Sequence, residues 1–341
     1  MHKIALIGGD GIGPEVVDEA MRVVAATKVP FTTSSYDLGA ARYIKDKVVL
    51  PDETLAELRG FDAIMLGAIG PAIGSKEVPS GILERGLLLK LRFELDLYIN
   101  HRPFITPPTG NGGRFEDVDF IVIRENTEGT YAGEGGLLRR GTPHEIATQG
   151  SVNTRFGVER AIRYAFELAN SRLRKHLTLV HKTNVLTFSG DLWQRTFDEV
   201  SKEYPDVATA YNHVDAACIY MVDSPSRYDV VVTDNLFGDI ITDLAGAISG
   251  GIGHAASANL NPARTGPSLF EPVHGAAHDI VGTGKANPIA AIRSAALMLD
   301  FLGEGKAAKA IFDVLGQYSP NSTMTTSEIG NEIAERVANA N

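Results

Sequence analysis

Two aspartates four residues apart, Asp239 and Asp243, have the spacing in this sequence that most directly suggests chemistry. In a helix this spacing places both carboxylates on one face. Carboxylate oxygens suit Mg²⁺ or Mn²⁺, and Asp215, at the end of a predicted strand, could supply a third ligand. On a solvated helix face the same pair costs only a few tenths of a kcal/mol. The spacing therefore leaves a metal site and an ordinary surface as equal alternatives.

Three arginines, Arg92, Arg102 and Arg124, each lie at the edge of an apolar segment. A guanidinium can bind a carboxylate through two parallel hydrogen bonds, so three convergent arginines would suit a dicarboxylate. Any one of them taken alone is more often part of a surface salt bridge. Only as a group do they favour a dicarboxylate site.

A lysine and a tyrosine are the candidates for proton transfer. Lys182 follows the predicted strand Leu177–His181, and a lysine near carboxylates can act as a general base. Tyr131, a few residues after Arg124, could act as a general acid. Considered alone, each is more often a surface residue, so both roles depend on neighbours.

A glycine-containing run over residues 269–288 is the fourth candidate. Its small residues would allow a ligand to approach the backbone, and Asp279 could bond a ribose diol. The alternative is a long surface loop. The length of the run favours binding, because long loops in compact domains are usually functional or disordered.

The elements that must position these residues alternate along the chain, which predicts an α/β fold with buried strands covered by helices. The predicted strands are Lys3–Ile7, Asp62–Leu66, Asp119–Arg124, Leu177–His181, Val207–His213 and Asp229–Thr233. The predicted helices are Pro14–Ala26, Thr154–Arg174, Asp191–Tyr204, Phe237–Ser249 and one opened by Thr325–Glu328, which has capping-box spacing.

The glycines at Gly8–Gly13 invite a Rossmann interpretation, but their spacing is wrong. Pro14 stands where the third glycine of the dinucleotide fingerprint is needed, and no acidic residue follows at the required distance. We therefore expect only a tight turn between strand and helix. Two other segments look irregular: Pro103–Arg114 as a loop or lobe boundary, and Gly129–Gly150 as an extended arm.

Composition limits the class of protein. A chain of 341 residues is long for one core, which favours two lobes. The net charge of −10 disfavours nucleic-acid and anionic membrane partners, and no apolar run reaches the roughly 18 residues of a membrane helix. A single cysteine, Cys218, and an N-terminus that leads straight into a strand fit a cytoplasmic enzyme.

Seven runs together resemble the isocitrate/isopropylmalate dehydrogenase family over essentially the whole chain. Five carry the family resemblance: 9–16, 100–103, 124–129, 234–240 and 270–275. Two more, 83–93 and 178–186, are similar to its isopropylmalate branch. The resemblance implies a two-lobed subunit with a central mixed sheet, not a Rossmann fold. Residues 1–98 and 250–341 would form a split cofactor-binding domain, and 99–249 a second domain with the dimer interface and an arm near 129–150.

The activity implied by the resemblance is NAD-dependent oxidative decarboxylation of a 2-hydroxy dicarboxylate, 3-isopropylmalate, to 4-methyl-2-oxopentanoate and CO₂ in leucine biosynthesis. The enzyme would be a homodimer with shared active sites and a bound Mg²⁺ or Mn²⁺. Catalysis would use Lys182 as the base, directly or through Asp215, and Tyr131 as the acid. The metal ligands would be Asp215, Asp239 and Asp243, with Lys182 and Asp215 supplied across the dimer.

Three further groups of residues receive roles from the resemblance. The substrate carboxylates would be bound by Arg92, Arg102 and Arg124. An apolar pocket for the isopropyl group would be formed by Leu87, Leu88 and, from the partner subunit, Val185, although core packing must account for some of the leucines. The NAD site would be lined by Glu271, His274, Gly275, Asp279, Ile280 and Asn287. An acid at 279 would favour a 2′-hydroxyl over a 2′-phosphate.

Two alternatives stay open. Asn126 and the run Ala276–His278 differ from the isopropylmalate branch, where glycine and Ser-Ala-Pro are usual, and His101 replaces an aliphatic residue. Asn-Thr-Glu-Gly is commoner in related tartrate/malate enzymes, so a D-malate/tartrate dehydrogenase is the first alternative. A non-catalytic regulatory subunit is the second, but it would lack a metal ligand, an arginine or the base, all of which are present here.

Overall fold

The computed structural model describes residues 1–106, 118–321 and 323–340, and the chain divides into two compact units. Unit 1 comprises Met1–Leu97, Pro103–Glu116 and Gly246–Asn341, and unit 2 comprises Tyr98–Arg102 and Asp117–Ala245. The division expected from the sequence differs in assigning 103–116 and 246–249 to the second domain and Tyr98 to the first. The predicted loop Pro103–Arg114 lies outside the described residues from position 107 onward.

Unit 1 contains an α/β layer built on the strand order β2-β1-β3-β12-β11. Its elements are β1 (His2–Gly9), α1 (Gly13–Ala26), β2 (Phe31–Ser35), α2 (Ala40–Asp46), α3 (Asp52–Leu58), β3 (Ala63–Ala68), the π-helix η1 (Glu84–Leu89), α4 (Lys90–Glu94), η4 (Ile252–His254), β11 (Ala256–Leu260), β12 (Ser268–Pro272), η5 (His278–Ile280), α9 (Ile289–Phe301), α10 (Gly305–Leu315) and α11 (Thr326–Ala340). The strands are parallel except that β11 is antiparallel to β12.

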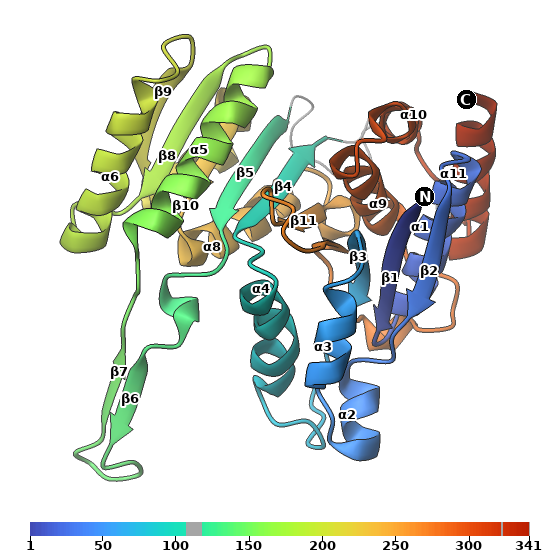
Figure 1. The fold of residues 1–341 in the computed structure, drawn as a ribbon, viewed down its shortest axis with the longest axis horizontal. Helices are drawn as coiled ribbons and strands as arrows, with labels where there is room; N and C mark the ends of the chain where they lie inside the picture. Colours follow the sequence, from blue (N-terminus) through green and yellow to red (C-terminus); the bar gives the residue numbers. More distant parts are fainter. Residues whose placement is uncertain (107–117, 322, 341) are drawn as a thin grey trace. The chain divides into compact units, whose positions relative to one another are not determined.

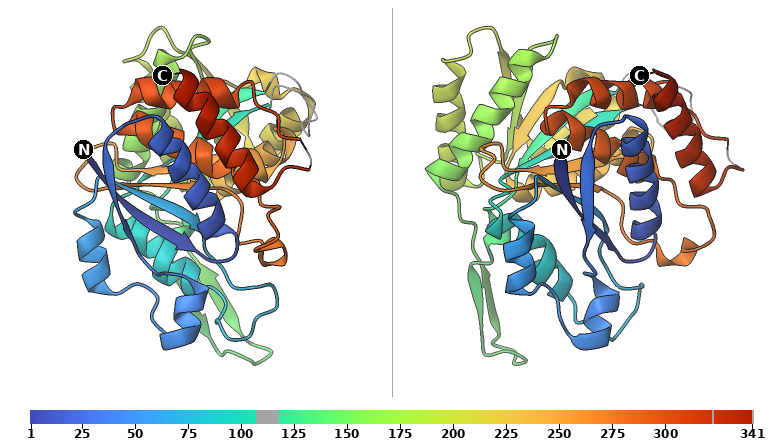
Figure 2. Two further views of the ribbon diagram at one scale, coloured as in Figure 1. Left: turned by 90° about the vertical axis from the view of Figure 1, so that its right-hand side faces the viewer. Right: turned by 45° about the vertical axis from the view of Figure 1, so that its right-hand side comes forward.

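The faces of this sheet are buried by different helices. Strand β3 is buried along its whole length, as expected for a strand covered on both faces. Alternate strand residues such as Ile7, Ile64 and Leu66 form one core cluster with Leu55 of α3 and Leu91 of α4. Helix α1 packs on α9 and α11 instead, and Figure 2 shows α1 and α11 lying side by side.

Unit 2 has the strand order β4-β5-β10-β8-β9, and β5, β10, β8 and β9 run parallel. Its elements are β4 (Ile99–Ile105), which ends in unit 1, β5 (Asp119–Glu125), η2 (Thr130–Ala132), β6 (Gly135–Leu138), β7 (Ile146–Gln149), α5 (Arg155–Ser171), β8 (His176–His181), α6 (Thr187–Ser201), β9 (Ala208–His213), α7 (Val214–Asp223), η3 (Pro225–Arg227), β10 (Val230–Thr233) and α8 (Asn235–Ile248). Helices α5 and α6 pack on each other and against these strands (Figure 1).

An isolated two-stranded ribbon forms the segment predicted to be an arm. Strands β6 and β7 pair antiparallel, and every residue of both is exposed. Figure 1 shows the ribbon extending away from the other strands of unit 2. A hairpin without a third strand or a covering helix is marginally stable in water, so the exposed Leu137, Leu138 and Ile146 require some other apolar contact.

All six predicted strands and five predicted helices are present, within a few residues of their expected limits. The capping box is confirmed, because Glu328 Oε2 accepts the N–H of Thr325 at 2.7 Å and Thr325 Oγ1 accepts the N–H of Glu328 at 3.3 Å. Two expectations were wrong. Asp215 lies in the first turn of α7 rather than at a strand end, and the run that begins at Leu269 opens as a strand, β12, before it becomes a loop.

The described part of the chain contains no helix that is both long and apolar enough to cross a membrane.

Candidate active site

Helix α8 and strand β5 bring three of the predicted residues together in unit 2. Asp239 Oδ1 accepts a hydrogen bond from Arg124 Nη1 at 2.5 Å, and Asp239 Oδ2 accepts one from the Tyr131 hydroxyl at 2.8 Å. Arg124 is almost fully buried and also donates two bonds to Asn235 Oδ1. A side chain at Gly238 would meet Arg124 Cγ at 2.5 Å, so glycine is required for this approach. Arg124, Asp239 and Tyr131 therefore form a hydrogen-bonded cluster of a guanidinium, a carboxylate and a phenol.

Arg102 reaches the same helix from β4. Its Nη1 donates to Thr242 Oγ1 at 2.6 Å, and its side chain is 7% exposed. Thr242 lies between Asp239 and Asp243, which is exposed one turn further along α8. Two predicted substrate arginines and two predicted metal ligands thus converge on one helix.

Lys182 and Asp215 form a second group. Lys182 Nζ donates to Asp215 Oδ1 at 2.7 Å, and Val185 and Leu186 anchor the lysine's carbonyl through their N–H groups. The hydrogen bond from Lys182 lowers the pKa of the Asp215 carboxyl, which keeps it ionised. Within the described ranges, no three His, Cys, Asp or Glu side chains lie close enough together to hold a metal ion. A single chain therefore places Asp215 with Lys182 and not in a carboxylate cluster.

Sequence reasoning missed a buried pair beside these groups. His181 Nε2 lies 3.4 Å from Asp234 Oδ2, and Asp234 Oδ1 accepts the N–H of Phe237 at the start of α8. Burial raises the pKa of Asp234 to about 7 and lowers that of His181 to about 4. Both residues lie in runs that carry the family resemblance, 178–186 and 234–240, but no spacing within either run predicts that the two side chains pair.

Asp234 should make stability depend on pH. Its folded-state pKa of about 7 lies above the unfolded value of about 3.9. Its stabilising contribution is therefore fully present below the unfolded value and is lost as pH rises through about 7. Relative to Asp234→Asn, whose amide oxygen can still accept the Phe237 N–H, the wild-type thermal midpoint should fall between about pH 4 and 7 and level off above. Parallel curves would contradict this prediction.

In unit 1, Arg92 lies near an acid predicted to bind the cofactor. Arg92 Nη2 is 3.8 Å from Glu271 Oε1, which also accepts a bond from Asn259 Nδ2 at 2.8 Å. Both side chains of the ion pair are largely buried.

The residues of the predicted apolar pocket lie in different surroundings. Leu87 is fully buried in the core cluster of unit 1, so its assignment to a substrate pocket is not supported. Leu83, Leu87 and Leu91 are all buried, at the four-residue spacing that keeps side chains on one face of a helix. Leu88 is partly buried, and Val185 of unit 2 is 64% exposed.

The predicted cofactor residues lie in the last part of β12 or follow its carboxyl end. Strands β1, β3 and β12 are parallel, so their carboxyl ends share the edge of a sheet where α/β proteins bind ligands. His274 Nδ1 bonds the carbonyl of Gly275, whereas its Nε2 is buried without a partner, and burial lowers its pKa. This neutral ring therefore keeps an acceptor for a ligand's N–H. Asp279 is exposed in η5, and Asn287 Oδ1 accepts the first N–H of α9.

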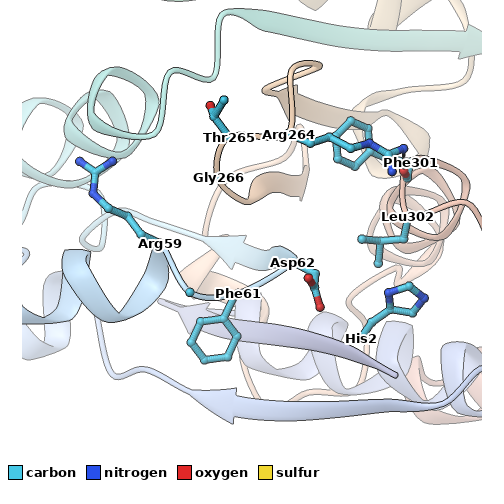
Figure 3. Close-up of a pocket in the computed structure, with 10 residues that line it drawn as sticks. His2, Arg59, Phe61, Asp62, Arg264, Thr265, Gly266, Phe301 and Leu302 are labelled. Atoms are coloured by element: carbon cyan, nitrogen blue, oxygen red, sulfur yellow. Dashed lines mark hydrogen bonds between the residues drawn. The ribbon is translucent and has the colours of Figure 1, made fainter.

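A cavity of about 440 Å³ in unit 1 is not the predicted site (Figure 3). It is lined by residues at the amino ends of β1 and β3, including His2 and Asp62. His2 and Arg59 already pair with Glu304 and Glu94. None of the predicted site residues lines this cavity.

Known proteins resemble the chain over nearly its full length. The family model for isocitrate/isopropylmalate dehydrogenase matches residues 3–339. A 3-isopropylmalate dehydrogenase of Corynebacterium efficiens is 59% identical over 98% of this chain and 99% of the relative. The enzyme of that name from Mycobacterium tuberculosis is 56% identical over 97% and 99%.

Solved structures agree with this result. The isocitrate dehydrogenase of Methylococcus capsulatus has a TM-score of 0.88 and 40% identity, covering 99% of this chain and 100% of that one. A β-decarboxylating dehydrogenase of Thermococcus kodakarensis has a TM-score of 0.81 and 35% identity, covering 99% and 97%. The chain belongs to the isocitrate/isopropylmalate dehydrogenase family.

Proposed function

We propose that the protein catalyses the NAD-dependent oxidative decarboxylation of 3-isopropylmalate in leucine biosynthesis, in the cytoplasm. The observation that carries the reaction type is Asp239, which is shared between Arg124 and Tyr131 and lies one turn from Asp243. Relatives at 55–59% identity that bear the name 3-isopropylmalate dehydrogenase support the substrate.

Asp239 and Asp243 fit a divalent cation, because carboxylates one helical turn apart, the first partly buried and the second exposed, offer hard oxygen ligands. Bound there, Mg²⁺ or Mn²⁺ would offset the carboxylate charge and polarise the substrate's hydroxyl oxygen. A third ligand, Asp215, lies with Lys182 and not in such a cluster. We therefore assign Lys182 and Asp215 to the active site of a second copy, in a homodimer.

Exposed apolar side chains in unit 2 support the homodimer. Large exposed apolar surfaces usually mark interfaces, and identical chains most often pair with twofold symmetry. The exposed side chains include Leu137, Leu138, Ile146, Phe156, Val185, Phe188, Ile219 and Ile240.

Different residues of the chain then bind the substrate, accept its proton and return a proton. Arg92, Arg102 and Arg124 bind the substrate carboxylates, and NAD⁺ supplies the hydride acceptor. Lys182 Nζ, held by Asp215, takes the proton of the substrate hydroxyl. After CO₂ leaves, the Tyr131 hydroxyl donates a proton to the carbon that carried the lost carboxylate. Asp239 already orients this hydroxyl.

Residues of unit 1 hold the cofactor in this proposal. His274 offers an unpartnered ring nitrogen. The other proposed NAD residues lie within 271–287 as well: Glu271, Gly275, Ile280 and Asn287. The exposed Asp279 carboxylate would accept bonds from a ribose 2′-hydroxyl and repel a 2′-phosphate, which favours NAD over NADP.

The alternatives gain no support from the geometry. Asn126, which suggested a D-malate/tartrate dehydrogenase, is fully buried. Leu88 and the exposed Val185 remain available for an isopropyl group. A regulatory subunit is disfavoured because the acids, arginines, lysine and tyrosine are all present.

The test is NADH formation with Mn²⁺ or Mg²⁺ on parallel substrates. The panel is 3-isopropylmalate, D-malate, tartrate, isocitrate and homoisocitrate, each with NAD⁺ and NADP⁺. We expect kcat/KM to be highest for 3-isopropylmalate with NAD⁺. A preference for D-malate or tartrate would replace the proposed substrate, and no turnover on any of them would point to the regulatory subunit.

A further inference from the structure

Three loops of unit 1 are joined by hydrogen bonds at the carboxyl ends of β1, β3 and β12. The N–H of Ile12 donates to the carbonyl of Ala276 at 2.8 Å. The N–H of Gly70 donates to Asp10 Oδ2 at 3.0 Å, and the carbonyl of Gly70 is 2.8 Å from His278 Nε2. A carbonyl only accepts, so Nε2 carries the proton in this bond. The loop that follows β12 is thus tied to both other loops.

Asp10 makes the Gly70 end of this connection rigid. Its buried carboxylate also accepts the N–H groups of Ala40 and Ala41 at the start of α2, at 2.8 and 3.1 Å. Gly70 is therefore held by its N–H on one side and by His278 on the other. A fixed acceptor allows a surface histidine to position the loop that carries it.

The loop needs such restraint because its backbone is strained just before His278. Ala277 has φ 39° and ψ 54°, in the left-handed region that residues with a side chain rarely adopt. Non-glycine residues keep this conformation only where surrounding contacts over-determine it, and such positions cluster at ligand clamps. The contacts on either side of Ala277 are the Ile12–Ala276 and Gly70–His278 bonds.

We infer that His278 is a positioning residue for the cofactor: its bond to Gly70 holds η5 in the conformation that presents Asp279 and Ile280. Residue 278 is the first of η5, so the restraint acts directly beside Asp279. A bond from Gly282 N–H to Glu15 Oε1, at 2.7 Å, restrains the far end of the turn. The inference rests on the proposed NAD site, but the bond itself can be tested without it.

The test compares His278→Ala, His278→Gln and a matched control, His2→Ala. Gln can place an N–H donor near the Nε2 position, whereas Ala cannot. His2 Nε2 also makes a 2.8 Å bond on the surface of unit 1, to Glu304, but at the amino end of β1. We expect His278→Ala to raise the KM for NAD⁺ and the Kd for NADH about 5-fold, since it removes one hydrogen bond. The kcat and the KM for 3-isopropylmalate should stay within about 2-fold of wild type.

Rescue separates positioning from general destabilisation. His278→Gln should recover most of the NADH affinity, and His2→Ala should leave it unchanged. An unchanged KM for NAD⁺ in His278→Ala would overturn the inference. So would an equal loss of NADH affinity in His278→Gln, or a fall in kcat without any change in the Kd for NADH.

Hydrogen exchange tests the bond independently of activity. The amides of Ile280, Gly282 and Thr283 are hydrogen-bonded within or beside the turn. Their exchange in the unliganded full-length protein should be faster in His278→Ala than in wild type or His278→Gln. If the wild type turns over none of the substrates, the proposed function is wrong. The exchange comparison still shows whether the His278 bond restrains the turn. Equal exchange in all the variants would overturn the inference.

Discussion

Replacing Lys182 with Met should lower kcat by about 10²–10⁴-fold, the usual contribution of a positioned general base. Methionine keeps an unbranched side chain as far as Cε and removes the amine that donates to Asp215 at 2.7 Å. The fold should tolerate the change, because the Lys182 side chain is 24% exposed and its carbonyl, not its amine, anchors the turn to α6. The NADH dissociation constant should not change, since Lys182 is not among the residues proposed to hold NAD.

The matched control is Lys202→Met, which removes an exposed lysine just after α6 in the same unit. It should keep wild-type kcat. Stopped-flow and steady-state measurements of NADH formation give kcat for both variants. Fluorescence titration of NADH gives the dissociation constant. Near-normal turnover by Lys182→Met would remove Lys182 from the mechanism, and a matching loss in the control would show a general effect of lost charge.

Helices and strands whose apolar residues recur at a regular spacing could be predicted from the sequence. So could site residues that lie a few positions apart on one such element. The 3.6-residue period placed α8, and with it Asp239 and Asp243 on one turn. The strands that were missed lack the alternation or aliphatic run that signals a strand. β2 is a polar, exposed edge, β4 contains Pro103, and β11 consists mostly of small and polar residues.

What could not be predicted depends on packing between distant segments. Leu87 and Leu88 are adjacent residues of the same type, and only the packing of unit 1 shows that Leu87 is buried in the core while Leu88 is partly buried. The pairing of His181 with Asp234 joins residues more than fifty positions apart, and no local spacing predicts it. The bond between His278 and Gly70 spans 208 positions.

Asn in place of Asp243 should weaken the binding of Mn²⁺ by at least about 100-fold, since even the partners of metal ligands contribute about 10–100-fold. This position gives a clean test. The carboxylate of Asp239 is bonded to Arg124 and Tyr131, so its replacement would also disturb those residues. Asp243 is exposed, and no hydrogen bond or ion pair holds its side chain in the described part of unit 2. Its loss should therefore remove a ligand and leave the cluster of Arg124, Tyr131 and Asp239 in place.

Free Mn²⁺, measured by electron paramagnetic resonance during titration, reports binding without reference to turnover. The control is Asp223→Asn, an exposed aspartate at the end of α7 whose replacement changes the net charge equally. If Asp243 is a ligand, its variant alone loses affinity, and a higher Mn²⁺ concentration restores part of the activity because the base and the arginines remain. If both variants bind Mn²⁺ as the wild type does, the spacing of Asp239 and Asp243 marks only a solvated helix face. The metal would then have to be held by other residues.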